Sequence, residues 1–515
     1  MIFTSLFKSE KLVSTLTIGF FALFLFAAMY DMSLFSQSIN TLFGYAADGF
    51  GTFWQWLMVA NLALALLVAV SPYGGMKLGK QSKPDISAFR WIAMIMCTLL
   101  AGGGVFWSAA EPVYHFMSPS PAYDGVDENS LAAVTAALSQ SFLHWGFLAW
   151  AVLGTLATIV LMHAHYEKGL KLRPRALLYP LFGERFEKHW FGAVVDACSI
   201  VGVAAGTIGP IGFLASQLGY SVEVLFGVEN ELGTQIFILM GVVAIYSLSA
   251  FTGMDKGLQW LSKLNVLGAL ALLVVVLVLG PTSFIFDSFF HAFGSYIGNF
   301  SAMSIEANSA DWMTSWTWFF WGWFIGFAPM MAIFIAKISR GRSIRMLVVA
   351  VAVGSPIVTN FWFTALGGTG IFFELTDPGS ISDAMSGAGL PGILIATLQQ
   401  LPLQLILVPA FLILTTTFVA TTGDSMAYSI AVVTSEDSTP SKYNRLFWAL
   451  LLGIVAAVLL MAGNGGLAAL QSFIVITAVP VSLLIATTLI SAPITLVKMQ
   501  PVSEEMEANG EKVFG

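Results

Sequence analysis

Charged side chains are scarce in this sequence. Of its 515 residues, only 10% are Asp, Glu, Lys or Arg, whereas 57% are hydrophobic. This composition leaves too little polar material to cover a soluble protein of this length. The sequence therefore predicts an all-α integral membrane protein that lies in the lipid bilayer, and we expect no nucleic-acid partner.

Cysteines are rare and recognisable catalytic motifs are missing. Cys97 and Cys198, the only cysteines, both lie inside long apolar runs, so we expect no structural disulfide. The six histidines form no HExxH pair, and the chain has no phosphate-binding loop for ATP. We therefore expect neither an enzyme nor a cofactor, and an ion gradient is the expected source of energy.

Long apolar runs, in contrast, are abundant. A helix needs about 20 apolar residues to cross the hydrocarbon core of a bilayer. Such runs predict twelve transmembrane helices, at residues 12–31, 53–72, 89–110, 140–163, 192–219, 234–252, 258–281, 313–338, 344–371, 402–434, 445–463 and 469–497. The first run has no small-residue cleavage site after it, so we interpret it as a retained helix rather than a signal peptide.

Lys and Arg are distributed unevenly over the loops between these spans. All 22 of them fall at the termini or in and beside the loops that follow even-numbered spans, whereas the other loops carry acids. By the positive-inside rule, both termini are cytoplasmic. We expect a multi-pass protein of the bacterial inner membrane.

Two spans are interrupted by small residues. Span 3 has three consecutive glycines at 102–104, and span 8 has Gly322, Gly326 and Pro329. Matched interruptions are typical of transporters with inverted repeats, although glycines also let helices pack closely. We favour two inverted five-helix repeats, spans 3–7 and spans 8–12. The predicted parts are a cytoplasmic N-terminus with spans 1 and 2 (1–87), the first repeat (88–282), an extracytoplasmic surface helix (283–312), the second repeat (313–497) and a short acidic cytoplasmic tail (498–515).

Span 8 is unusually rich in aromatic residues. Its rings recur every three or four residues from Trp316 to Phe327, so most share one helix face. An interfacial belt is the alternative, but these positions rise about 17 Å along the helix, against roughly 5–8 Å for one interfacial layer. Aromatic faces attract quaternary ammonium groups through cation–π contacts. Trp145 and Trp150 on span 4 and Tyr114 at the end of span 3 offer further rings to such a pocket.

Span 10 carries hydroxyl groups and an acid. Thr421 and Thr422 offer neutral oxygens, which suit a hard monovalent cation such as sodium. Threonines in spans also bond back to their own helix, which is the alternative. Asp424 is a functional candidate because acids inside membranes are costly, and a structural partner on a neighbouring helix is an equal alternative.

Several motifs along the chain point to one family. The most specific is in span 8, which reads WTWFFWGW at 316–323 and ISRGRSIR at 338–345. Others are Phe106-Trp107 with Glu111, His144-Trp145-Gly146, Lys256-Gly257 and Thr421-Thr422-Gly423-Asp424-Ser425. With these motifs the chain resembles the betaine/choline/carnitine transporter family from about residue 12 to 497. The resemblance implies a LeuT-like fold of twelve transmembrane helices, a homotrimer, and alternating-access transport of onium zwitterions.

Carried onto this sequence, the resemblance implies a substrate site built of aromatic residues. The substrate-binding residues would be Trp323, Phe324 and Phe327 on span 8, Trp145 on span 4 and Tyr114 on span 3, with Phe319 and Trp150 on the path. Betaine and carnitine carriers typically have Trp in place of Phe324, and Trp or Tyr in place of Phe327. A glycine betaine-like substrate is expected, and choline, carnitine and dimethylsulfoniopropionate stay open as alternatives.

The resemblance also bears on ion coupling. Sodium-independent members of the family place an arginine on span 7 where this chain has Asn265. The expected sodium ligands are therefore Cys97 and Leu100 through their carbonyls, with Phe418, Thr421 and Thr422. We predict a sodium symporter that imports its substrate. The alternatives are a sodium-independent antiporter of the carnitine type and a membrane sensor or receptor that does not transport.

Overall fold

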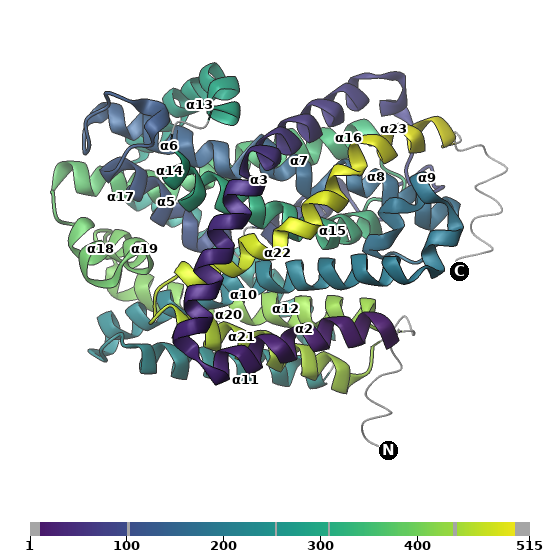
Figure 1. Cartoon of the computed structure of the whole chain (residues 1–515). Helices are drawn as coiled ribbons and strands as arrows, with labels where there is room; N and C mark the ends of the chain where they lie inside the picture. Colours follow the sequence, from purple (N-terminus) through teal and green to yellow (C-terminus); the bar gives the residue numbers. More distant parts are fainter. Residues whose placement is uncertain (1–10, 100–102, 253–254, 307–308, 436–439, 500–515) are drawn as a thin grey trace.

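The computed structural model describes residues 11–99, 103–252, 255–306, 309–435 and 440–499, without the side chains of 97–99, 188 and 255–262. Every long regular element in these residues is a helix, so the predicted all-α class is confirmed (Figure 1). The first half forms α2 (Lys11–Tyr30), α3 (Met32–Val70), α4 (Ala88–Leu99), α5 (Val105–Met117), α6 (Leu131–Trp145), α7 (Phe147–Gly154), α8 (Leu156–Met162), α9 (Tyr179–Phe182), α10 (Trp190–Phe226), α11 (Leu232–Thr252) and α12 (Asp255–Leu279). The second half forms α13 (Thr282–Ile305), α14 (Ala310–Ser315), α15 (Thr317–Ile338), α16 (Ile344–Val349), α17 (Ser355–Thr376), α18 (Ser382–Ala388), α19 (Leu390–Gln399), α20 (Gln404–Val433), α21 (Lys442–Ala462), α22 (Ala468–Ala486) and α23 (Thr488–Lys498).

Among the described residues, ten helical segments are long and apolar enough to cross a membrane, or up to eleven if one bent pair counts as a single span. They correspond to ten of the twelve predicted spans. Predicted span 3 contains α4 and α5, which have 12 and 13 residues, and residues 100–102 between them lie outside the described part of the chain. Predicted span 7 lies in α12, and the chain turns by 108° between α12 and α13. The number of twelve therefore stays a prediction.

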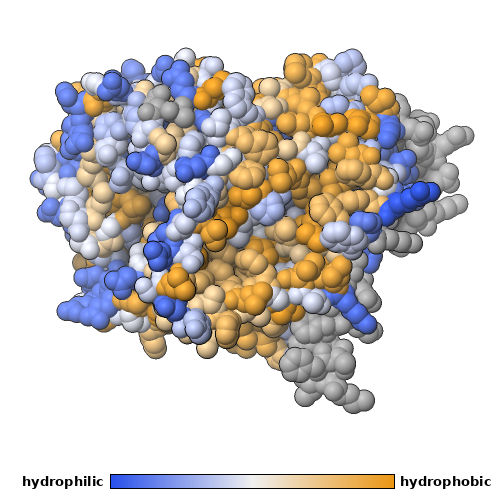
Figure 2. All heavy atoms as spheres, in the orientation of Figure 1, coloured by the Kyte–Doolittle hydropathy of each residue, from blue (hydrophilic) through white to orange (hydrophobic). Residues whose placement is uncertain are grey.

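The surface of the molecule matches a membrane protein. Figure 2 shows hydrophobic side chains over a broad central band, with hydrophilic side chains gathered at two opposite sides. Large apolar side chains such as Met29, Phe237 and Leu405 are exposed. Helices α13, α18 and α19 lie toward one side, and the first residues of α2 and the last of α23 lie toward the other (Figure 1). The two described ends of the chain thus share one side of the molecule.

Helix α15 is continuous from Thr317 to Ile338, so the expectation that span 8 is interrupted in its middle is wrong. The break falls earlier, at Trp316, whose torsion angles separate α14 from α15. Gly322 instead allows close packing, because a Cβ there would lie 3.0 Å from the Trp54 ring on α3. For span 8, the alternative of close helix packing is the correct one.

Predicted span 4 is broken at a place that the sequence did not indicate. Helix α6 ends at Trp145, Gly146 has φ −94° and ψ −138°, and α7 begins at Phe147. A Cβ on Gly146 would overlap the carbonyl of the preceding turn and would lie 2.6 Å from the Tyr296 hydroxyl on α13. That hydroxyl accepts a hydrogen bond from the Phe147 backbone N–H at 3.3 Å, so the break is satisfied by a neighbouring helix.

Candidate substrate and ion sites

Aromatic rings from five helices meet around α15. The Trp145 ring, at the end of α6, packs edge-on against Trp323 and Phe324, with centroids 5.9 and 5.2 Å apart. Trp323 and Phe324 are nearly parallel, with 8° between their planes. Rings from α5, α10 and α17 join them. We call this set the aromatic cluster: Trp107, Trp145, Phe213, Phe319, Phe320, Trp323, Phe324 and Phe363.

Hydrogen bonds hold the two central indoles at their polar edges. Trp323 Nε1 donates to the carbonyl of Gly206 at 3.0 Å. Trp145 Nε1 donates to Oε2 of Glu111 at 2.8 Å. Rotating either ring would break a buried hydrogen bond, at a cost of about 1 kcal/mol or more. Each indole is therefore held in one orientation, and its π face is what remains for a ligand.

Two glycines, by having no side chain, make room for these rings. A Cβ on Gly103, just before α5, would overlap the ring of Trp323 and would lie 2.9 Å from that of Trp145. A Cβ on Gly206, in α10, would lie 3.0 Å from Phe327 and 3.3 Å from Trp323. The glycine run predicted to interrupt span 3 thus supplies one of the two close approaches on which the position of the tryptophans depends.

The residues predicted to bind substrate do not all join the cluster. Its members from that prediction are Trp145, Phe319, Trp323 and Phe324, and Phe327 lies beside Trp323 across Gly206. Tyr114 is one step away, because its ring packs on Trp316 at 4.6 Å and Trp316 packs on Trp107. Trp150 lies apart: its indole donates to Thr359 on α17 at 3.1 Å, and in the described residues it has no ring contact with the cluster.

The aromatic cluster is packed rather than open. Trp145, Phe319 and Phe324 are fully buried, and Trp323 is 4% exposed. The separations between ring centroids are contact distances, so a quaternary ammonium group reaches a π face only when the rings move apart. The cluster can hold a cation between α6 and α15 if these two helices separate.

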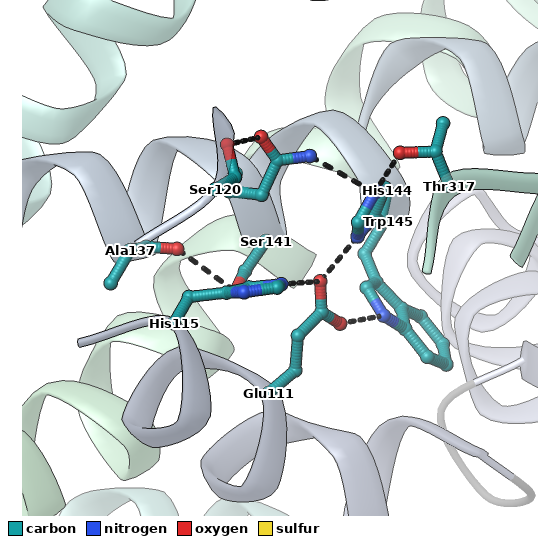
Figure 3. Close-up of polar contacts among 9 residues, drawn as sticks. Glu111, His115, Ser120, Ala137, Ser141, His144, Trp145 and Thr317 are labelled. Atoms are coloured by element: carbon teal, nitrogen blue, oxygen red, sulfur yellow. Dashed lines mark hydrogen bonds and ion pairs between the residues drawn. The ribbon is translucent and has the colours of Figure 1, made fainter. Parts of the chain in front are cut away.

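Glu111 is the polar centre beside the cluster, a role that we did not predict from the sequence. Its Oε1 is hydrogen-bonded to Nδ1 of His144 at 2.5 Å, and its Oε2 accepts the bond from Trp145 (Figure 3). Nε2 of His144 contacts Oγ1 of Thr317 at 2.9 Å and the amide nitrogen of Gln140 at 3.0 Å. We call these buried residues, with Ser120 beyond Gln140, the carboxylate network. The available signal was an acid within a transmembrane span.

The predicted sodium ligands are only partly described. Leu100 lies outside the described residues, and of Cys97 only the backbone, within α4, is described. The hydroxyl of Thr421 donates to the carbonyls of Thr417 and Phe418, at 2.9 and 3.0 Å. Both bonds lie within α20, so in this structure the hydroxyl makes the intrahelical bonds that were the alternative to an ion contact.

Asn265 on α12 contacts the same threonine. Its Nδ2 donates to Oγ1 of Thr421 at 2.8 Å, and its Oδ1 accepts a bond from the Thr417 hydroxyl at 2.6 Å. Two residues linked to sodium coupling from the sequence, Asn265 and Thr421, are therefore direct neighbours. Their oxygens are neutral and close together, which is the ligand type that sodium takes. Thr422 follows on α20 and is partly buried.

Asp424 has a partner on a neighbouring helix. Ser249 on α11 donates to its Oδ2 at 2.5 Å, and the carboxyl group is almost entirely buried. This contact joins α11 to α20. The structural alternative stated for Asp424 therefore accounts for its position.

Residues 12–501 match the family described as betaine/carnitine/choline family transporters. The chain therefore belongs to this family, as its motifs indicated, and it is a membrane transporter rather than an enzyme.

Curated relatives support this membership. The glycine betaine transporter 2 of Vibrio parahaemolyticus is 48% identical over 475 residues, which cover 92% of this chain and 88% of that protein. An ectoine/hydroxyectoine transporter of Virgibacillus pantothenticus is 31% identical over 477 residues, covering 92% of this chain and 93% of that protein. A Na⁺-coupled sialic acid symporter in a substrate-bound, outward-open state aligns with a TM-score of 0.43 and 13% identity, over 90% of this chain and 99% of the symporter.

Proposed function

We propose that this protein imports a glycine betaine-like onium zwitterion together with sodium, by alternating access. The observation that carries this proposal is the meeting of Trp145, Trp323 and Phe324, in a chain 48% identical to a glycine betaine transporter. A quaternary ammonium group has no hydrogen to donate, so π faces bind it better than hydrogen-bond acceptors do. The two tryptophans are the main proposed partners, because Phe is the weaker cation–π partner.

The contact between α12 and α20 is the proposed sodium site. Asn265 is uncharged and presents an oxygen, whereas an arginine at this position would repel a cation. Thr421 and Thr422 supply hydroxyl oxygens, and Phe418 supplies a carbonyl from the same helix. Binding of sodium would require the Thr421 hydroxyl to turn away from its own helix. The carbonyls of Cys97 and Leu100 remain proposed as the ligands from span 3.

The finer architecture is part of the same proposal. Twelve spans in two inverted repeats, at 88–282 and 313–497, follow the LeuT-like fold that the family resemblance implies. The interruption of the first repeat at the glycine run 102–104 stays part of this proposal. The distribution of Lys and Arg supports cytoplasmic termini in a bacterial inner membrane. The homotrimer is proposed from the family resemblance.

Uptake into proteoliposomes tests the function. Purified protein is reconstituted and offered labelled glycine betaine, choline, carnitine and dimethylsulfoniopropionate, each with an inward sodium gradient or with potassium in its place. We expect glycine betaine to accumulate only with the sodium gradient. Exchange of internal for external substrate without sodium would establish the antiporter instead, and binding without accumulation would establish the sensor or receptor.

A further inference from the structure

The carboxylate network contains a buried acid, Glu111, that has no permanent positive charge beside it among the described residues. Glu111 is fully buried in α5, and within the described part of the chain its ion-pair partners are His144, at 2.5 Å, and His115, at 3.7 Å. A histidine is positive only after it takes up a proton. A lone carboxylate in the interior of a membrane protein is costly, which strongly favours a proton bound close to it.

One arrangement of protons satisfies the hydrogen bonds of this network. When the amide nitrogen of Gln140 faces Nε2 of His144, it donates and Nε2 accepts, so the proton of a neutral ring is on Nδ1. Nδ1 then donates to one oxygen of Glu111 while the Trp145 indole donates to the other. Both carboxyl oxygens are therefore acceptors, and in this arrangement the carboxylate network carries one negative charge.

The network can take up one proton, on Nε2 of His144, without losing a hydrogen bond. In the structure, the hydroxyl of Ser120 donates to the amide oxygen of Gln140 at 2.9 Å. If the amide of Gln140 turns over, its oxygen faces Nε2 of His144 and its nitrogen donates to the hydroxyl of Ser120. The Thr317 hydroxyl, 2.9 Å from Nε2, becomes an acceptor by rotating its hydrogen away. The result is a neutral pair of imidazolium and carboxylate.

We propose that Glu111 and His144 form a proton-binding site whose occupancy is linked to the binding of the substrate's onium group at the aromatic cluster. Trp145 joins the two, because its N–H is bound by Glu111 and its ring packs on Trp323. A cation at the cluster is attracted more strongly by the negative, unprotonated network than by the neutral one. Binding of the cation therefore displaces the proton, and by the same linkage substrate affinity rises with pH. The link rests on the proposed function, whereas the proton site does not.

Other titratable groups around the site are bound elsewhere or less well placed. His115 is less well placed, because its Nε2 lies 3.7 Å from Oε1 of Glu111, which is too far to share a proton with it. From α14, the ring of Trp312 packs on both histidines. The other charged or titratable groups on the helices packed against α5, α6 and α15 are solvent-exposed, partly exposed or bound to other partners. Tyr45, Asp48, Asp287, His291, Asp311 and Lys337 are exposed, and Cys198, Tyr220 and Glu223 are partly exposed. Tyr296 binds Phe147, Asp196 pairs with Arg175, and Glu374 binds the backbone of 379–382.

A pH titration of tryptophan fluorescence, on purified protein without substrate, tests the proton site. The Trp145 indole is bonded to the titrating pair, so we expect a transition that fits one proton in the wild type. Glu111→Gln and His144→Gln should lose this transition, and the controls His115→Gln and His291→Gln should keep it. An unchanged transition in His144→Gln, or its loss in His115→Gln alone, would overturn the site.

Thr317→Val provides a second test of the proton site in case Glu111→Gln or His144→Gln does not fold. Size-exclusion chromatography would reveal such a failure. It removes one acceptor of the protonated ring, and hydrogen bonds to charged groups are the stronger ones. We expect the midpoint of the transition to move to lower pH. A midpoint that stays in place would contradict the assignment of the proton to Nε2.

Glycine betaine affinity across the same pH range tests the link. We expect affinity in the wild type to rise with pH, by up to about tenfold per unit on the acid side of the fluorescence midpoint, and to level off above it. Glu111→Gln should show no such slope. A wild-type affinity that does not change across the transition would overturn the link. Absence of glycine betaine binding at every pH would overturn the proposed function and the link with it, while the proton site is decided by the fluorescence titration alone.

Discussion

The aromatic cluster and the contact between α12 and α20 use their polar groups in opposite ways. At the cluster, polar groups lie outside the ring assembly and fix it, as Glu111 fixes Trp145, so the rings themselves are what a ligand meets. At the α12–α20 contact, the oxygens that would bind an ion are already bonded to one another, as Thr421 is to Asn265. Opening the first requires helices to separate, whereas opening the second requires only a hydroxyl to rotate. Substitutions should therefore have larger effects at the cluster.

The largest expected effect is that of Trp323→Ala. A desolvated cation–π contact is worth roughly 2 kcal/mol or more, so we expect affinity for glycine betaine to fall by about 30-fold or more. Binding calorimetry on the purified variant measures this. Trp190→Ala, at an exposed tryptophan, is the control that should bind normally. Near-normal affinity in Trp323→Ala would place the substrate elsewhere.

Gly103→Ala should come next. The added methyl group would overlap the Trp323 ring and press on Trp145, and both rings are held in position by hydrogen bonds. Overpacking of this kind costs about 1–3 kcal/mol, so we expect a drop in affinity of about tenfold together with slower uptake. Gly49→Ala on α3 meets nothing within 4 Å and serves as the control. If both variants transported equally well, the rings would have more freedom than their packing indicates.

The double variant Thr421→Ala and Thr422→Ala addresses the ion site. Losing neutral oxygen ligands should raise the sodium concentration for half-maximal uptake by about tenfold, equivalent to roughly 1.4 kcal/mol. Substrate affinity at saturating sodium should change little. Thr416→Ala is a matched control, because among the described residues that hydroxyl bonds only to its own helix, at Leu412. An unaltered sodium dependence in the double variant would remove these residues from the ion site.

Trp150→Phe should have the smallest effect on binding. Trp150 makes no ring contact with the cluster in the described residues, so we expect glycine betaine affinity within about twofold of the wild type. Loss of its buried bond to Thr359 should cost about 1 kcal/mol of stability and lower the melting temperature. A tenfold loss of affinity without a change in melting temperature would indicate that Trp150 does lie on the substrate path.

The aromatic face of span 8 could be predicted because it depends on spacing alone. Rings three and four residues apart share a face on any helix, so Phe319 and Trp323 had to lie together. The roles of the glycines beside them could not be predicted in this way. Gly103 and Gly322 look alike in sequence, yet one makes room for two rings of the cluster and the other packs against Trp54 on α3. What a glycine accommodates depends on the neighbouring helix, which local sequence does not specify.

Composition and periodicity by themselves determined that this chain is a helical membrane protein, and its motifs determined the family. Both are local properties, since a helix satisfies its own backbone in lipid and a motif lies within one segment. Only the tertiary structure decided that Glu111 and His144 would join Thr317, that Asn265 would bond to Thr421, and that Trp150 would stand apart. These are contacts between residues up to 209 positions apart, and they follow from how the helices pack rather than from the pattern within any one of them.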